Sequence, residues 1–111
     1  MRGTFVITRE HAFRAAQNAV RNQGYAVAMH GSRIRDLDLL AVPWRETCID
    51  AQRCAEIIAK AIPGVLLEPA EEKPYGRLAW EIHPLRSAGH KWGHGFDQWY
   101  VDLSVMPRCG D

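Results

Sequence analysis

The sequence predicts an α+β domain in which two helices cover one face of a single-layer mixed β-sheet. Two segments, 9–22 and 50–61, gather apolar residues on one face with the 3.6-residue period of an α-helix. Five other segments are short and apolar, or alternate between apolar and polar residues as strands do. The order helix, two strands, helix, three strands is typical of an α+β domain.

The two expected helices have recognisable ends. In the first, Thr8 is a suitable N-cap and Gly24 a suitable stop. The second ends before Pro63 and Gly64. Their apolar stripes are Ala12, Phe13, Ala16, Ala19 and Val20 in the first helix, and Ala51, Cys54, Ala55, Ile58, Ala61 and Ile62 in the second.

The expected strands cover residues 25–29, 36–42, 65–67, 76–83 and 96–106. Trp80 alternates with polar or small residues in the fourth strand and is expected in the core. Residues 69–74 are expected to form a solvated loop. Residues 84–95 form a loop of about 12 residues, which is long enough to suggest a functional role.

Length and composition limit the class of protein. A chain of 111 residues accommodates one domain, 1–111, with a core that needs no metal or disulfide. Its net charge of +1 gives no basis for extended nucleic-acid binding or for contact with an anionic membrane. No apolar run approaches the roughly 18 residues of a membrane helix, and the N-terminus lacks a signal-peptide pattern. Cys48, Cys54 and Cys109 form no CxxC pair and are expected to be free thiols in a cytoplasmic protein.

Acidic residues on two strands are the most informative feature. Asp36 and Asp38 share one face of their strand, about 7 Å apart at Cα, whereas Leu37 and Leu39 point to the other face. Like charges on one face repel each other unless a cation lies between them. Mg²⁺ typically binds one or two carboxylates together with substrate phosphates. If the last strand neighbours this one, Asp102 completes a three-carboxylate site, which can hold two ions for in-line displacement at phosphorus.

A turn with phosphate-binding groups precedes these aspartates. Gly31 lets the backbone approach a phosphate, and the Ser32 hydroxyl can donate a hydrogen bond to it. Arg33 and Arg35 can neutralise a triphosphate. These four residues are the candidate nucleotide-binding residues, and the three aspartates are the candidate catalytic and metal-binding residues.

This arrangement resembles the nucleotidyltransferase superfamily typified by DNA polymerase beta, and in size its minimal members. The resemblance rests on Gly31 and Ser32 after a strand, on Asp36 and Asp38 around one hydrophobic residue, and on Asp102 in a later strand. It implies a Mg²⁺-dependent enzyme that moves a nucleoside monophosphate from a nucleoside triphosphate to a hydroxyl of a protein, small molecule or nucleic-acid end. It covers residues 13–105 in element order. The sequence around the two motifs, 29–44, also looks like small phage and prophage proteins.

The spacing between the turn and the aspartates leaves a second interpretation open. The superfamily places about ten residues there, part of them a helix whose N-terminus helps to bind phosphate. Here residues 33–35 alone intervene, so the two strands are expected to form a tight hairpin. The alternative is therefore an inactive nucleotide- or protein-binding module of the same fold, such as a phage-encoded modulator. For the enzyme, a chain of 111 residues has no room for a separate acceptor-binding domain, so the acceptor is expected to be small, to be held by the 84–95 loop or to come from a protein partner.

Aromatic and histidine residues of the long loop are further candidates. Trp92 is the candidate to stack on a nucleotide base. His90 and His94 are four residues apart and, with Cys109, have the residue types of a zinc site. The other readings of these histidines and of His83 are a substrate-contacting loop or a solvated loop without a special role.

The strands flanking that loop carry two more candidates. Glu81 is a candidate general base or supporting ligand, or the partner of Arg77 in a surface salt bridge. Either Trp99 or Tyr100 is expected to line the acidic face, because both precede Asp102 on the last strand.

Overall fold

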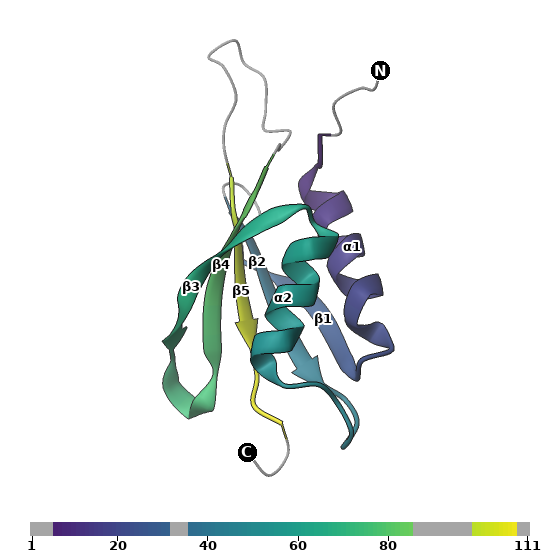
Figure 1. Cartoon of the computed structure of the whole chain (residues 1–111), viewed down its shortest axis with the longest axis vertical. Coiled ribbons are helices and arrows are strands. Elements are labelled where there is room, and N and C mark those ends of the chain that lie inside the picture. The colour runs from purple at the N-terminus through teal and green to yellow at the C-terminus, as the bar shows by residue number, and fades with distance from the viewer. Residues whose placement is uncertain (1–5, 32–35, 86–98, 109–111) are drawn as a thin grey trace.

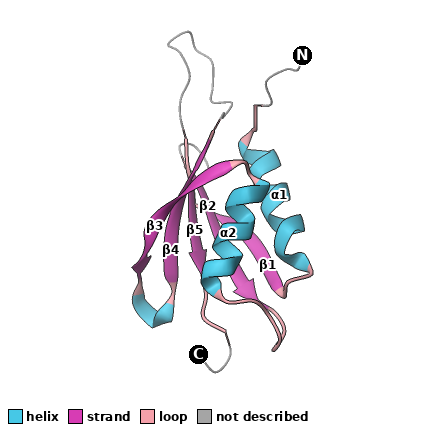
Figure 2. Cartoon of the chain, viewed as in Figure 1, coloured by secondary structure: helices cyan, strands magenta, loops and turns pink. Residues whose placement is uncertain are grey.

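Two helices lie on one face of a five-stranded sheet in the computed structural model of the chain, which describes residues 6–31, 36–85 and 99–108 (Figure 1). The elements are α1 (Arg9–Arg21), β1 (Tyr25–His30), β2 (Leu37–Pro43), α2 (Ala51–Ala61), β3 (Gly64–Glu72), a short 3-10 turn (Pro74–Gly76), β4 (Leu78–Pro84) and β5 (Val101–Val105). The expected α+β class and the position of both helices on one face are confirmed (Figure 2).

Both helices begin at a side-chain cap. The Thr8 hydroxyl accepts a hydrogen bond from the His11 backbone N–H at 3.1 Å, as expected from its N-cap position. Asp50 is the N-cap of α2 and accepts from the Arg53 N–H at 2.8 Å, so the helix starts one residue later than expected. In the described part of the chain, no helix has the length and hydropathy needed to cross a membrane.

The sheet has the strand order β1-β2-β5-β4-β3. Strands β2 and β5 run parallel, and the other three pairs are antiparallel, so the expected mixed sheet is confirmed. The antiparallel pairing of β1 with β2 confirms the expected hairpin. The chain reaches β5 only after α2, β3 and β4, and this crossover places β5 parallel to β2 at the centre of the sheet.

The core lies between the helices and one face of the two central strands. Leu37, Leu39 and Ala41 of β2 have no exposed surface, and neither have the three valine and leucine residues that alternate along β5. Trp80 of β4 is 2% exposed, which confirms its expected place in the core. Because side chains alternate along a strand, the residues between these apolar ones face away from the helices.

The strand boundaries needed one substantial correction. Residues 69–74 were expected to be a solvated loop, but β3 extends through most of them to Glu72. The strand looks like a loop in sequence because it lies at the sheet edge, where charged residues and proline are tolerated. Its pairing with β4 is also interrupted between Leu67 and Glu71, which breaks the alternation of apolar residues. At the last strand, β5 covers Val101–Val105, and residues 96–98 lie outside the described part of the chain.

Candidate functional site

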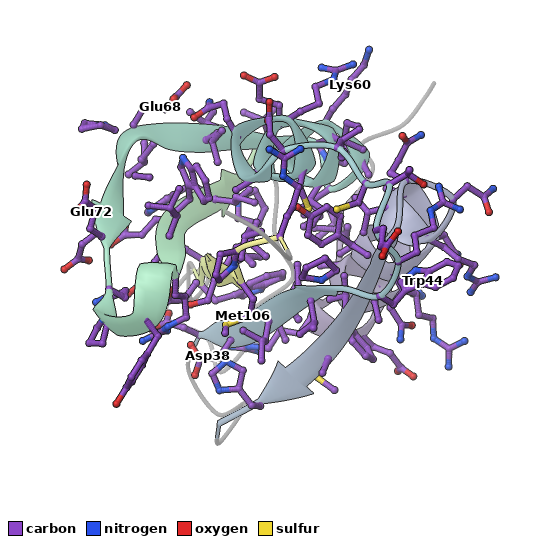
Figure 3. All side chains as sticks on the ribbon, turned by 90° about the horizontal axis from the view of Figure 1, so that it is seen from below. Asp38, Trp44, Lys60, Glu68, Glu72 and Met106 are labelled. Carbon is purple, nitrogen blue, oxygen red and sulfur yellow. The ribbon has the colours of Figure 1, made fainter. Side chains whose placement is uncertain are left out.

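The sheet face opposite the helices carries two of the predicted site aspartates side by side. Asp38 of β2 and Asp102 of β5 are register partners on neighbouring parallel strands, so both leave the same face at the same level. Figure 3 shows Asp38 on the side of the sheet away from α2. Glu81 of β4 is the partner of Asp102, and His30 of β1 is the partner of Asp38. These four side chains form one row across four strands, which we call the acidic row.

The third predicted ligand, Asp36, has a different neighbour. It lies just before β2, where the Leu37 N–H donates to the Tyr100 carbonyl at 3.0 Å. The Tyr100 hydroxyl donates a hydrogen bond to the Asp36 carboxylate. Among the described residues, no three His, Cys, Asp or Glu side chains are arranged to hold a metal ion. The three-aspartate metal site therefore stays a prediction, and Asp38 with Asp102 is the pair that the fold brings together.

The electrostatic surroundings of Asp102 are negative. Burial is the largest cause that raises the pKa of its carboxyl, and the charges of Asp38 and Glu81 raise it further. Lys73 and His30 act in the opposite direction but do not cancel the effect. Nearby positive charge thus does not balance the negative charge of the ionised Asp102 carboxylate, and a cation placed beside it would relieve the repulsion.

Tyr100 lies two residues before Asp102 on the same face of the sheet, and so it is next to the acidic row. The pKa of its hydroxyl is raised, chiefly by the negative charge of Asp36 and then by burial and the charges of Glu81 and Asp102. Trp99, by contrast, is 3% exposed and belongs to the core. The expectation that one of these two aromatic residues lines the acidic face is confirmed for Tyr100.

Gly31 lies directly against the Asp38 carboxylate. Its φ of +81° is a conformation that residues with a side chain rarely adopt. A Cβ at this position would collide with the Asp38 carboxylate oxygen. The glycine was singled out for close approach to a phosphate, and the structure adds a second reason for it: it leaves space for the Asp38 side chain.

A groove of about 230 Å³ adjoins the acidic row on the side of β3 and β4. It is lined by Asp102, Glu81 and Lys73, among others. Lys73 also forms an ion pair with Glu71 at 3.2 Å. Sequence reasoning missed Lys73, because only the folding of the β3–β4 hairpin brings it to the groove. A larger hollow of about 750 Å³ lies along α1 and contains none of the three predicted aspartates.

Glu81 does not pair with Arg77 as the salt-bridge interpretation supposed. Arg77 instead donates a hydrogen bond to the Ser104 hydroxyl at 2.9 Å. The Glu81 carboxylate lies 2.9 Å from Nε2 of His83. The i, i+2 spacing of these two residues on one strand face was the available signal, since side chains two apart on a strand are neighbours.

Several predicted site residues fall outside the described part of the chain. These are Ser32, Arg33, Arg35 and Trp92, together with the zinc candidates His90, His94 and Cys109. Their roles remain predictions. Of the other cysteines, half-buried Cys48 and buried Cys54 are free thiols, as expected.

Comparison with known proteins adds no assignment. The chain matches no protein-family model, and no curated protein is significantly similar to it in sequence. We therefore infer the function of the chain from the geometry and chemistry of the sheet face opposite the helices.

Proposed function

We propose that the open face of the sheet binds a nucleoside triphosphate with Mg²⁺ and transfers its nucleoside monophosphate to a hydroxyl acceptor. The observation that carries the proposal is the pairing of Asp38 with Asp102 at matched positions of neighbouring parallel strands. Two aspartates at paired positions do not stabilise the sheet, because like charges directly opposite each other are destabilising. A function that uses a cation accounts for their position.

The residues of the acidic row fit a Mg²⁺ ion. Protein sites for Mg²⁺ commonly supply one or two carboxylates and leave the remaining positions to water and substrate phosphates. Asp38 and Asp102 would be these ligands. Burial and then the charge of Asp38 raise the pKa of Asp102, so its ionised form is disfavoured and a bound cation would stabilise it. When bound, Mg²⁺ would supply charge stabilisation for the phosphates during the displacement.

Other groups of the chain would bind and orient the nucleotide. Lys73 lies close enough to lower the pKa of Asp102, and its ammonium, which pairs with Glu71, would bind a phosphate oxygen beside the row. Ser32, Arg33 and Arg35 are proposed to contact the phosphates, and Trp92 the base. The small groove next to Asp102 offers room for an acceptor that carries a hydroxyl.

A second candidate function is nucleotide or protein binding without transfer. It is favoured by the engagement of Asp36 with the Tyr100 hydroxyl, which leaves two aspartates rather than three in the acidic row. The short connection between Gly31 and Asp36 also leaves no length for a phosphate-binding helix.

Pyrophosphate release separates the two candidates. Each of the four nucleoside triphosphates is incubated with the chain and Mg²⁺, and pyrophosphate is measured. Transfer predicts release that falls at least about 100-fold in Asp38→Asn and Asp102→Asn, as expected when a charge-stabilising group is lost. Glu46→Gln, an exposed substitution in the loop before α2, is the matched control and keeps full release. Nucleotide binding without any release supports the second candidate, and release that is unchanged in Asp38→Asn contradicts the proposed site.

A further inference from the structure

A histidine–carboxylate pair connects the acidic row with the next level of the sheet: Glu81 belongs to the row, and His83 has no role in the function proposed so far. Glu81 and His83 project from the same face of β4, because they are two residues apart on one strand. Oε1 of Glu81 and Nε2 of His83 are 2.9 Å apart. Glu81 is at the level of Asp102, so His83 lies about 7 Å further along the strand direction.

The imidazole of His83 is held in a defined orientation. Its ring stacks on the ring of Tyr100, with centroids 5.0 Å apart and an angle of 11° between the planes. Tyr100 is itself tied to Asp36 by its hydroxyl. On the other side, the register partner of His83 on β3 is Val65, which carries no charge. Within residues 6–31, 36–85 and 99–108, the titratable groups nearest His83 are Glu81 on its own strand and Tyr100 just before β5, whose hydroxyl contacts Asp36.

The pair is accessible as well as oriented. The side chains of His83 and Glu81 are 45% and 49% exposed, so an acceptor molecule can reach the ring from solvent. Ion pairs with this exposure contribute little to folding stability. Folding stability therefore gives little reason for placing a histidine and a glutamate together at this position.

We propose that His83 is the general base of the transfer reaction and that Glu81 is its positioning residue, an inference that rests on the proposed function. This assignment requires the tautomer in which Nε2–H donates to Glu81 and Nδ1 carries the lone pair. As the acceptor oxygen forms its bond to the α-phosphorus, its proton moves to Nδ1. The bond from the α-phosphorus to the bridging oxygen breaks, and pyrophosphate leaves with the electron pair. The imidazolium formed is stabilised by the Glu81 carboxylate and afterwards releases its proton to solvent.

The experiment measures hydrolysis of ATP to AMP and pyrophosphate, with water as the acceptor hydroxyl, by the full chain and Mg²⁺ over a range of pH. His83→Gln is expected to lower turnover by about 10²- to 10⁴-fold without changing ATP affinity. Turnover by the wild type should depend on pH, as expected for general-base catalysis, and His83→Gln should lose this dependence. Glu81→Gln should lower turnover by a smaller factor without changing ATP affinity, because the ring loses the carboxylate that orients it. Added imidazole should restore turnover to His83→Ala but not to Asp38→Asn.

Two controls separate this inference from the function on which it rests. His11→Gln, an exposed histidine on α1, is the matched control and keeps wild-type turnover and pH profile. If Asp38→Asn is inactive but His83→Gln retains full turnover and the same profile, the base assignment is wrong and the transfer function stands. If the wild type neither binds ATP nor releases pyrophosphate, both fail. Nitrogen NMR tests the pair without activity: the Nε2–H tautomer of His83 is expected at neutral pH, and the Nδ1–H tautomer contradicts the assignment.

Discussion

Different physical effects account for the residues on the two faces of the sheet. On the face toward the helices, Leu37 and Leu39 of β2 are fully buried, and their burial accounts for their presence. On the other face, Asp38 lies between them in sequence and beside Asp102 in space. Removing apolar surface from water drives the first arrangement, whereas repulsion opposes the second. The helix-covered face therefore specifies the fold, and the opposite face carries the site that we propose.

The largest expected effect contrasts neighbours on β2. Leu39→Ala should lower the free energy of unfolding by about 2–5 kcal/mol, because it removes a buried side chain and leaves a cavity. Asp38→Asn should be neutral or slightly stabilising, since it removes a charge that repels Asp102. Urea unfolding of both variants measures the difference. If Asp38→Asn destabilised the protein as much as Leu39→Ala does, the division between the two faces would be wrong.

A smaller effect concerns the glycine beside the row. Gly31→Ala and Gly76→Ala place an alanine at φ values of +81° and +78°, so both should lose about 1–2 kcal/mol of stability through backbone strain. Only Gly31→Ala also pushes a Cβ into the Asp38 carboxylate. It should therefore be the less stable of the two and should alone weaken Mg²⁺-dependent ATP binding. Equal ATP binding by both variants would show that the position of Asp38 does not matter.

The smallest expected effect is the pH dependence caused by Asp102. Its pKa is raised in the folded protein, so the folded state holds the proton more tightly than the unfolded chain, and ionisation destabilises the fold. This penalty is absent below the ordinary pKa of 3.8 and develops as the pH rises through the folded value. Without Mg²⁺, Asp102→Asn should be more stable than wild type at pH 7, by less than about 1 kcal/mol because the group is partly solvated.

Unfolding curves at several pH values measure this difference. The advantage of Asp102→Asn should vanish in acid, and added Mg²⁺ should reduce it by stabilising the wild type. If the stability advantage of Asp102→Asn grew as the pH falls, the pKa of Asp102 would be lowered by folding rather than raised, which would contradict the account.

Local patterns in the sequence were sufficient for the helices and for the two faces of β2. Thr8 is followed by a helical stripe, and Leu37, Asp38 and Leu39 alternate, so both signals are contained in a few adjacent residues. The course of β3 was not predictable, because the register shift after Leu67 interrupts its period.

The candidate site was predictable only in part, because local patterns show which face a residue occupies but not which strands are neighbours. Asp38 and Asp102 were expected on consistent strand faces, but their contact depends on β2 and β5 being neighbours, which only the tertiary fold decides. The hydrogen bond of Tyr100 to Asp36 and the approach of Lys73 to Asp102 involve elements far apart in the chain. No local pattern contains such contacts.

The central claim is that Asp38 and Asp102 form a cation-dependent nucleotide site. Titration calorimetry of ATP into the wild type, Asp38→Asn and Glu46→Gln, each with Mg²⁺ and with EDTA, tests it most directly. The wild type and Glu46→Gln should bind ATP at least about tenfold more tightly with Mg²⁺, a difference of about 1.4 kcal/mol, and Asp38→Asn should lose this difference. Equal affinity of the wild type and Asp38→Asn under both conditions would contradict the claim.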